Sequence, residues 1–328
     1  KKYMINDSLK RNLIKAKKDI NNCKVLCIGD IILDHYINGV VERISPEAPI
    51  PILLIQNQDY QIGGAGNVAK NISSLGGKVT LLCLSGNDTS SIIVKKLLLK
   101  EKKIKSVFIK VQNFTTPKKT RFMKKKTQLI RVDDENVNFK IKNKYLKTII
   151  EKIEKEVIKN DIIILSDYDK GLLEKEIIKK IIKISKKYDK KIIADPKKIN
   201  MSVYSNIDII TPNEKEITDS SKKKFLNEKN LIIYGKKIIN KFQITNLLVT
   251  RSEKGMLLIN KNSVKKIDAC AKKIIDVTGA GDTVVATLGL MLSIGFSLNE
   301  SIKIANYAAG LVIGKNGTAH IKYSDLIK

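Results

Sequence analysis

Short apolar runs rich in β-branched residues alternate along the chain with longer lysine-rich segments. The apolar runs are Val25–Ile28, Val79–Leu84, Asp161–Leu165, Lys191–Ala194, Ile207–Ile210 and Leu247–Thr250. Each is nearly continuous in apolar residues, which is typical of strands covered on both faces. Segments between them, such as Tyr145–Lys159 and Glu174–Lys187, carry Ile and Leu at helical spacing. This alternation predicts an α/β fold with a doubly wound, mostly parallel sheet.

Two regions break the alternation and carry no helical pattern. Residues 39–61 hold three prolines before an extended Ile52–Ile55, and residues 108–132 have the pattern of strands and turns around Pro117. We expect these regions to form a small β-rich lid over the ligand edge of the sheet, within about residues 36–61 and 108–132. No linker, repeat or low-complexity block divides the rest, so we predict a single domain over residues 1–328.

Polar clusters begin where the predicted strands stop. These clusters are Gly29–Asp34, Ser166–Gly171, Asp195–Lys198, Thr211–Glu216 and Thr250–Gly255. Open α/β sheets bind their ligands outside the carboxyl ends of the strands. The sequence therefore predicts a binding site at that edge, built from these clusters.

Composition narrows the class of partner. The 328 residues are 43% hydrophobic and carry a net charge of +29, which brings nucleic acid into consideration. The lysines are spread along the whole chain, aromatic residues are 5% and Trp is absent, which disfavours a base-stacking surface. No apolar stretch would span a bilayer, and residues 1–18 are too charged for the apolar core of a signal peptide. We expect a cytoplasmic protein that binds neither nucleic acid nor membrane, with four reduced cysteines and no zinc site.

The strongest chemical signal is residues 276–283, which read Asp-Val-Thr-Gly-Ala-Gly-Asp-Thr before an apolar helical run. Glycines just before a helix let backbone N–H groups converge on an anion, and the helix dipole favours negative charge there. Asp282 falls in the first helical turn, where a carboxylate can take a proton from a hydroxyl while the N–H groups hold a phosphoryl group. An ordinary capped helix start is the alternative. A Walker-type phosphate loop is absent.

A second signal is the glycine-rich segment at residues 63–71, Gly-Gly-Ala-Gly-Asn-Val-Ala-Lys-Asn. Paired glycines permit close backbone approach, and the amide of Asn67 can hydrogen-bond sugar hydroxyls in both directions. A tight turn that opens a helix explains the same segment equally well.

Together these motifs carry a resemblance. Gly-Gly-x-x-Asn at residues 63–67 and Asp-x-Thr-Gly-Ala-Gly-Asp at residues 276–282 resemble the two signatures of the ribokinase-like (PfkB) carbohydrate kinases. Residues 211–216, Thr-Pro-Asn-Glu-Lys-Glu, resemble that family's nucleotide and magnesium segment. The similarity runs over essentially the whole chain. It implies a ribokinase-like, Rossmann-like three-layer fold that uses ATP and Mg²⁺.

A finer resemblance concerns the substrate. Residues 29–34, 43–49, 166–171, 195–197 and 249–251 are similar to the heptose-7-phosphate kinases of lipopolysaccharide inner-core synthesis, whose kinase domain is often fused to a nucleotidyltransferase. This implies phosphorylation of D-glycero-β-D-manno-heptose 7-phosphate at the anomeric O1, giving the 1,7-bisphosphate for ADP-heptose. No nucleotidyltransferase domain is expected within residues 1–328. The alternatives are a ribokinase- or fructokinase-like kinase for a neutral sugar, a basic nucleic-acid-binding protein and a catalytically silent scaffold.

The resemblance also implies roles for individual residues. Asp282 is expected to be the base, with the amides of Gly279, Ala280 and Gly281 as the anion hole. The expected nucleotide-side residues are Asn213, Glu214, Lys215, Glu216, Thr250, Gly255, Thr278 and Asn306. The expected substrate residues are Asp34, Gly63, Gly64, Asn67, Arg121, Asp167, Lys170 and Lys197, with Arg121, Lys170 and Lys197 as the cations for the far phosphate.

Ions and assembly complete the expectations. Glu216 is expected to organise Mg²⁺ through water, because Mg²⁺ keeps several of its waters in kinase sites. Asp276 and Thr278 are expected near a monovalent cation such as K⁺. The expected partners are ATP, a small sugar phosphate and a second copy of the chain, paired as a homodimer through the lid.

Overall fold

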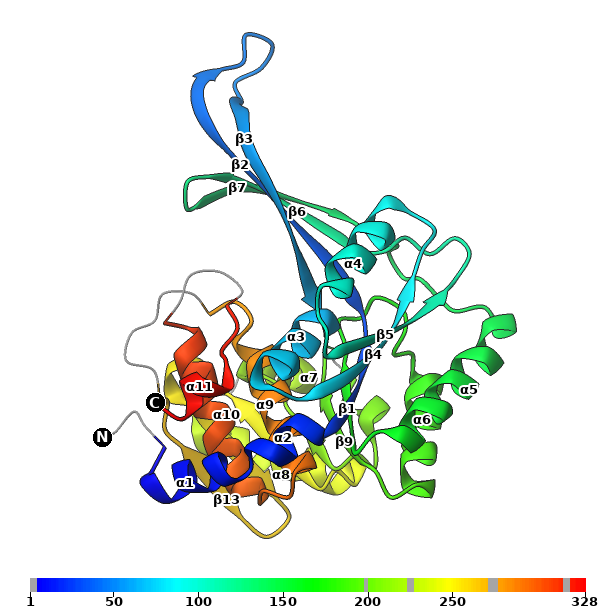
Figure 1. The fold of residues 1–328 in the computed structure, drawn as a ribbon, viewed down its shortest axis with the longest axis vertical. Helices are drawn as coiled ribbons and strands as arrows, with labels where there is room; N and C mark the ends of the chain where they lie inside the picture. Colours follow the sequence, from blue (N-terminus) through cyan, green and yellow to red (C-terminus); the bar gives the residue numbers. More distant parts are fainter. Residues whose placement is uncertain (1–4, 198–199, 223–226, 271–276, 315–318) are drawn as a thin grey trace.

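A computed structural model describes residues 5–197, 200–222, 227–270, 277–314 and 319–328. Its main sheet has nine strands in the order β13-β12-β11-β10-β9-β8-β1-β4-β5 (Figure 1). The strands are β1 (Lys24–Gly29), β4 (Lys78–Ser85), β5 (Ile104–Lys110), β8 (Ile162–Ser166), β9 (Lys191–Asp195), β10 (Ile209–Ile210), β11 (Asn246–Thr250), β12 (Met256–Asn260) and β13 (Val264–Ile267). All pairs are parallel except β11–β12 and β12–β13.

Helices cover both faces of this sheet. They are α1 (Asp7–Lys15), α2 (Lys17–Asn22), α3 (Ala65–Leu75), α4 (Thr89–Leu99), α5 (Asn143–Lys159), α6 (Lys175–Lys187), α7 (Glu214–Ser221), α8 (Glu228–Phe242), α9 (Ala280–Ser293), α10 (Leu298–Val312) and α11 (Tyr323–Leu326), with short 3₁₀ turns at Met201–Tyr204 and Ser252–Lys254. In β1, Val25 and Cys27 pack against α3 and α9, while Leu26 and Ile28 join the core under α5 and α6. The alternation explains why Val25–Ile28 of β1 is apolar at successive positions.

The predicted α/β fold is confirmed, and so are the named strands and helices. Strand β10 is shorter than predicted, Ile209–Ile210 instead of Ile207–Ile210. The residue before Ile207, Asn206, has a φ of 64°, so the chain is still turning there. The edge strand β5 and the antiparallel strands β12 and β13 were not predicted.

The expected lid corresponds to a second sheet, called here the projecting sheet. It has the order β3-β2-β6-β7 and comprises β2 (Ile31–Ile44), β3 (Pro51–Gly64), β6 (Lys118–Lys124) and β7 (Thr127–Asp134). Figure 1 shows its long β2–β3 hairpin extending away from the helical layers. The expected boundaries are corrected on one point: residues 108–110 belong to β5, because Phe108 pairs with Cys83 in the main sheet.

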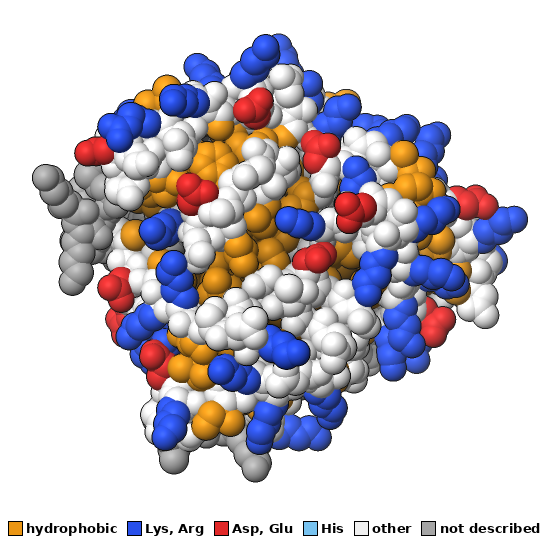
Figure 2. All heavy atoms as spheres, turned by 90° about the horizontal axis from the view of Figure 1, so that it is seen from below, with side chains coloured by type: hydrophobic (Ala, Val, Ile, Leu, Met, Phe, Trp, Pro, Cys, Tyr) orange, Lys and Arg blue, Asp and Glu red, His pale blue; other side chains and the backbone are white. Residues whose placement is uncertain are grey.

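The surface matches the spread of charge along the sequence. On the face seen in Figure 2, Lys and Arg side chains lie among acidic, polar and apolar groups instead of forming one continuous stripe. All four cysteines are free thiols. In the part of the chain that the structure describes, none of the helices combines the length and the apolar character needed to cross a membrane.

Candidate active site

The polar clusters that follow the strands meet around a small cavity. Its volume is about 140 Å³, and it lies at the carboxyl ends of β8, β9, β10 and β11, beside the start of α9. Its lining residues are Tyr168, Asp195, Lys197, Thr211, Asn213, Glu216, Thr250, Gly279, Gly281, Asp282, Val284 and Val285. This is the edge at which an open α/β sheet binds its ligands.

Helix α9 begins at this cavity without a side-chain cap. Its N-cap residue is Gly279, which has a φ of 79°, a conformation that favours glycine. The first amides of a helix have no intrahelical acceptor, and here no described side chain caps them. The Ala280 amide donates to the carbonyl of Val277 at 3.2 Å, whereas Gly279 and Gly281 line the cavity. Of the three residues expected to form the anion hole, Gly279 and Gly281 line the cavity, whereas the Ala280 amide is engaged locally.

Asp282 lies in the first turn of α9 with both carboxylate oxygens hydrogen-bonded. The amide of Asn67 donates to Oδ2 at 2.5 Å, and the hydroxyl of Tyr168 donates to Oδ1 at 2.7 Å. The side chain is buried, since the residue is only 7% exposed. Its neighbourhood therefore holds the carboxylate in one orientation beside the uncapped helix start.

Burial controls the acidity of this carboxylate. Desolvation raises the pKa of Asp282, the hydrogen bonds from Asn67 and Tyr168 lower it, and the net direction is upward. An aspartate whose pKa is raised accepts a proton more readily, which suits a general base. Burial and the charge of Asp282 also raise the pKa of Tyr168 well above its ordinary value, so its hydroxyl stays protonated and donates.

The loop after β8 holds the Tyr168 hydroxyl beside Asp282. The buried carboxylate of Asp30 accepts the N–H groups of Tyr168 and Lys170, both at 3.0 Å, and that of Leu172 at 3.2 Å. Three bonds from one side chain fix the turn after β8. Asp30 is therefore a positioning group for the loop that follows β8.

Two further acidic groups share the cavity with one cation. Burial, followed by the charges of Asp282 and Glu216, raises the pKa of Asp195 well above its ordinary value. Lys197 donates to Glu216 at 2.9 Å. Burial lowers the pKa of Lys197, but the bond to Glu216 and the other carboxylates outweigh that effect and raise it. Among the described residues that line the cavity, negative charge is thus concentrated around Lys197.

Residues Asn213 and Glu216 form a capping box at the start of α7. The Glu216 amide donates to Asn213 Oδ1 and the Asn213 amide donates to Glu216 Oε2, each at 2.8 Å. Both residues also line the cavity. Both residues therefore cap the helix and face the cavity at the same time.

A second cavity of about 280 Å³ opens beside the first and is more apolar. It is lined by Asn213, Thr250, Arg251, Ser252, Glu253, Gly255, Met256, Ala269, Cys270, Val277, Ala280, Gly281, Val284, Asn306, Ala309, Gly310 and Ile313. Asn213, Thr250 and Gly281 line both cavities. The φ of Gly255 is 76°, and a Cβ there would lie 2.0 Å from the carbonyl oxygen of Ile267. The residues predicted for the nucleotide, Thr250, Gly255 and Asn306, therefore all line this second cavity.

Glu214 and Lys215 face a neighbouring cavity instead of these two. Glu214 pairs with the buried guanidinium of Arg251 at 3.2 Å, and Lys215 pairs with Asp219 at 2.6 Å. The Lys215 side chain is 83% exposed. Because both side chains pair with other residues at this neighbouring cavity, the arrangement does not favour the expected contact of Glu214 and Lys215 with the nucleotide.

The expected sugar residues gather at the root of the projecting sheet. Asp34 on β2 pairs with Arg121 on β6 at 2.5 Å. A Cβ at Gly63 would lie 2.2 Å from Asp34 Oδ2, so glycine leaves room for that carboxylate. Gly64, with a φ of 60°, is the N-cap of α3, the helix that carries Asn67. The charge of Asp34 also acts on Asp282.

Several expected residues lie elsewhere. Asp167 is only 1% exposed and accepts from the Tyr204 hydroxyl at 2.6 Å and the Asp169 amide at 2.8 Å, so its carboxylate is engaged inside the fold, and it lines neither cavity. Lys170 pairs with Glu135 at 2.6 Å. Thr278 is exposed just before α9 and lines neither cavity. Asp276 lies outside the described residues.

The predicted site residues did not include Tyr168 and Asp195, which line the cavity with Val284 and Val285, or Asp30 and His320, which contact residues of the site. Tyr168 and Asp195 belong to polar clusters that follow strands, and that position was the available signal. His320 contacts Asn67, and a lone histidine far along the chain gives no such signal. Among the residues described, no group of three or more His, Cys, Asp or Glu side chains is arranged to hold a metal ion directly.

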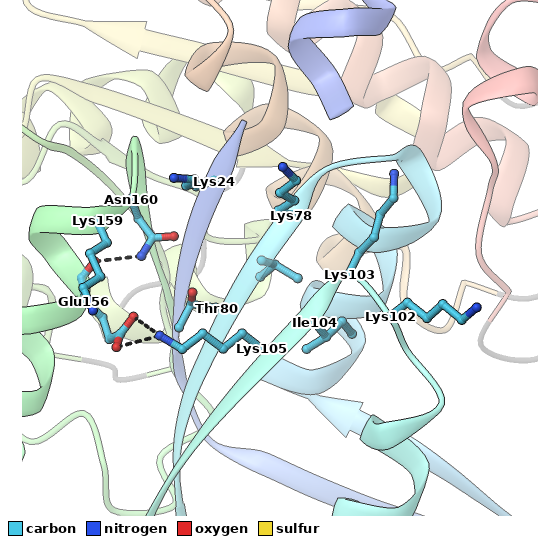
Figure 3. Close-up of a pocket in the computed structure, with 11 residues that line it drawn as sticks. Lys24, Lys78, Thr80, Lys102, Lys103, Ile104, Lys105, Glu156, Lys159 and Asn160 are labelled. Atoms are coloured by element: carbon cyan, nitrogen blue, oxygen red, sulfur yellow. Dashed lines mark hydrogen bonds and ion pairs between the residues drawn. The ribbon is translucent and has the colours of Figure 1, made fainter. Parts of the chain in front are cut away.

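A larger cavity of about 530 Å³ lies at the opposite edge of the main sheet, at the amino ends of β1, β4 and β5 (Figure 3). Six lysines line it, and the ammonium of Lys103 donates to the carbonyl of Gly76, the C-cap of α3, at 2.6 Å. Lys105 contacts both carboxylate oxygens of Glu156 at 2.8 Å. Helix carboxyl ends gather at this edge and favour cations. None of the predicted site residues lines this cavity.

Comparison with known proteins agrees with this geometry. Residues 22–324 match the family model described as pfkB family carbohydrate kinase. The bifunctional protein HldE of Granulibacter bethesdensis is 36% identical over 317 residues, which cover 94% of this chain and 65% of that protein. HldE of Campylobacter fetus subsp. fetus is 38% identical over 302 residues, covering 92% and 65%. The chain thus spans less than two thirds of the length of these relatives.

Solved structures support the fold. Phosphofructokinase-2 from Escherichia coli, solved with potassium, superposes with a TM-score of 0.75 at 19% identity, covering 93% of this chain and 96% of that one. Ribokinase from Arabidopsis thaliana, solved with ribose and ATP, gives 0.71 at 17% identity, covering 93% and 98%. The fold is ribokinase-like. From the family match and this site, the chain belongs to the pfkB family of carbohydrate kinases and is a sugar kinase.

Proposed function

We propose that the chain transfers the γ-phosphoryl group of ATP to the anomeric O1 of D-glycero-β-D-manno-heptose 7-phosphate, for ADP-heptose and lipopolysaccharide inner-core synthesis. The kinase chemistry rests on one observation: the buried, oriented carboxylate of Asp282 lies beside the uncapped amino end of α9. The sugar assignment is supported by the heptose-kinase segments of the sequence and by the HldE relatives.

In this proposal Asp282 accepts the proton of the O1 hydroxyl as O1 attacks the γ-phosphorus. The new O1–P bond forms while the bond between the γ-phosphorus and the bridging oxygen to the β-phosphate breaks, and ADP leaves with that electron pair. The amino end of α9 stabilises the charge of the transferring group, because helix dipoles and free N–H groups favour anions. Burial of Asp282 supports its role, since it raises the pKa of the base.

The more apolar second cavity suits the adenine and ribose of ATP. It joins the first cavity along Asn213, Thr250 and Gly281, so a nucleotide bound there would direct its phosphates toward α9. Lys197 was expected at the far phosphate of the sugar, but we assign its ammonium to the ATP phosphates instead, because it lies in the first cavity with a half-exposed side chain. Gly255 and Asn306 also line the second cavity, so we assign them to the nucleotide as well.

Mg²⁺ fits this site, because Mg²⁺ in kinase sites needs only one or two ligands from the protein. Kinase Mg²⁺ is held by one or two carboxylates, substrate phosphates and waters. Glu216 lines the cavity but already accepts from Lys197 and Asn213, which suits contact through water. The ion would neutralise charge on the phosphates. The resemblance of the sequence to the family also supports a monovalent cation such as K⁺ near Asp276 and Thr278, and we keep it in the proposal.

A phosphorylated sugar needs a cation away from the ATP side. Arg121 lies at the root of the projecting sheet beside Asp34, and Lys170, on the loop that carries Tyr168, pairs with Glu135 just after β7. Arg121 and Lys170 are therefore our candidates for the 7-phosphate, and Asp34 with Asn67 for the hydroxyls. Arginine is suited to this role because its planar fork can bind phosphate through two hydrogen bonds.

The same sheet supports a homodimer. Its strands expose a set of apolar side chains, namely Ile44, Leu54, Ile55, Leu129, Ile130 and Val132. A sheet that projects into solvent with this many exposed aliphatic residues is unusual for a surface with no partner. Pairing of two projecting sheets would cover them.

The function is tested by measuring ATP consumption with heptose 7-phosphate, ribose and fructose in parallel, with NMR of the product. Phosphorylation of heptose 7-phosphate at O1, with at least tenfold lower kcat/KM for the neutral sugars, supports the proposal. Preference for ribose or fructose would transfer the assignment to a neutral-sugar kinase. Salt-sensitive DNA binding without ATP turnover would contradict kinase function altogether.

A further inference from the structure

His320 is connected to the base through one amide. Its Nε2 lies 2.8 Å from Asn67 Oδ1, and the nitrogen of the same amide donates to Asp282 Oδ2 at 2.5 Å. The contact joins residues 253 positions apart in the sequence. His320 lines neither of the two cavities, so its reach to the reacting groups is indirect.

The donor and acceptor pattern fixes the proton on His320. A carboxylate only accepts, so Asn67 must turn its NH₂ group toward Asp282 and its oxygen toward His320. The histidine then has to donate through Nε2–H. With the amide reversed, its oxygen would face the carboxylate of Asp282, and a carbonyl and a carboxylate oxygen repel each other.

The other contacts of Asn67 fix where the residue lies, but they do little to decide which way its side-chain amide is turned. Its backbone carbonyl accepts from the Asn71 side chain at 2.9 Å, whereas Asn71 approaches its Oδ1 only at 3.5 Å. Asn71 in turn accepts from the Thr283 hydroxyl at 3.0 Å. Asn67 itself is 2% exposed, so solvent does not supply the missing donor. His320 is thus the strong donor on the oxygen side of the amide.

We propose that His320 is a positioning residue of the kinase reaction, which holds the amide of Asn67 so that its NH₂ group stays on the carboxylate of Asp282. The inference rests on the proposed role of Asp282 and not on the identity of the sugar. Without this donor the repulsion between the Asn67 oxygen and Asp282 is the main force against reversal, so the reversed amide is more populated and a larger fraction of molecules has a misplaced base.

The segment that carries His320 is anchored independently of this bond. Ile321 is fully buried, and the Tyr323 hydroxyl donates to the carbonyl of Leu13 in α1 at 2.9 Å. Leu326 in α11 is buried in the same core. This separate anchor offers a control that loosens the segment without touching the amide.

The test compares His320→Leu, His320→Gln and Tyr323→Phe with the wild-type protein, on whichever of the three sugars the wild type phosphorylates. Loss of one neutral hydrogen bond predicts a fall in kcat of about three- to tenfold for His320→Leu. The KM for ATP should stay within about twofold, because His320 lines neither cavity. His320→Gln places an amide N–H near the position of Nε2 and should restore at least half of the lost kcat. Tyr323→Phe should keep wild-type kcat.

Each alternative result has a definite meaning. Wild-type kcat in His320→Leu, no recovery in His320→Gln, or an equal loss in Tyr323→Phe would overturn the proposal, the last by showing that the segment acts through packing. Thermal melting of each variant separates misfolding from misplacement, and a folded His320→Gln keeps the test valid if His320→Leu does not fold. Asp282→Asn, measured in the same series, reports separately on the base: full activity there contradicts the proposed mechanism, and a double variant with no further loss supports coupling.

Discussion

Replacing Asp282 by Asn removes the proposed base while changing few contacts. The carboxylate accepts from Asn67 and from Tyr168, so an asparagine in its place can accept the first bond through its oxygen. The Tyr168 hydroxyl can rotate and accept from the new NH₂ group. We therefore expect Asp282→Asn to fold, and we expect its melting temperature to stay near or above that of the wild type because a buried charge has been removed.

The expected kinetic effect is large. Loss of a positioned general base costs about 10²–10⁴-fold in rate, or about 3–5 kcal/mol of transition-state stabilisation. Initial rates at saturating ATP and sugar phosphate, in a coupled ADP assay, measure this directly. A folded Asp282→Asn that keeps more than about a tenth of wild-type turnover would refute the role of Asp282.

Asp195 provides the matched control, because it is a second buried carboxylate of the same cavity. Burial and the charges of Asp282 and Glu216 raise its pKa well above the ordinary value, so asparagine resembles its protonated form. We expect Asp195→Asn to lose less than about tenfold in kcat. An equal or larger loss than in Asp282→Asn would make Asp195 the better candidate for the base.

The same variant has a predicted pH dependence of stability. Because the pKa of Asp195 is higher in the folded than in the unfolded chain, the folded state binds more protons. Its contribution is fully present at low pH and is lost as pH rises through the folded pKa. Asp195→Asn avoids this loss, so its melting temperature should exceed that of the wild type increasingly toward high pH. A constant or shrinking difference contradicts the raised pKa.

Three further substitutions address the sugar side and the assembly. Gly63→Ala places a Cβ 2.2 Å from Asp34 Oδ2, so we expect the KM for the sugar to rise about tenfold, and an unchanged KM would contradict this contact. Arg121→Met should raise the KM for the sugar phosphate by at least about tenfold without changing that for ATP, and the reverse pattern would remove Arg121 from the phosphate site. Leu54→Asp should convert a dimer to a monomer in sedimentation, whereas the exposed Leu99→Asp should not.

The sequence predicted six of the nine strands of the main sheet because burial on both faces leaves a plain signal. The first four residues of β8 are apolar, and helices such as α6 repeat Ile at helical spacing. The glycines before Asp282 likewise predicted a helix start, because their local conformation decides it. These are features that a short window of sequence contains.

What depended on distant contacts was not predictable in this way. Asn67 and Asp282 are 215 residues apart, and only the folded chain shows that they share a hydrogen bond. Asp167 lies in a polar cluster after a strand, the pattern expected of a ligand residue, yet Tyr204 and the backbone take up its carboxylate. Every residue of β7 is exposed, so that strand carries little burial pattern to define its ends.

The capping box at α7 affects how mutations of Glu216 must be designed. Glu216→Ala would remove a bond that stops the first turn of the helix from fraying, at a cost of about 1 kcal/mol, together with the carboxylate that faces Lys197. A loss of activity in that variant would then mix local unwinding with missing charge. Glutamine can close the same box, so Glu216→Gln changes only the charge and isolates the electrostatic part of the residue's contribution.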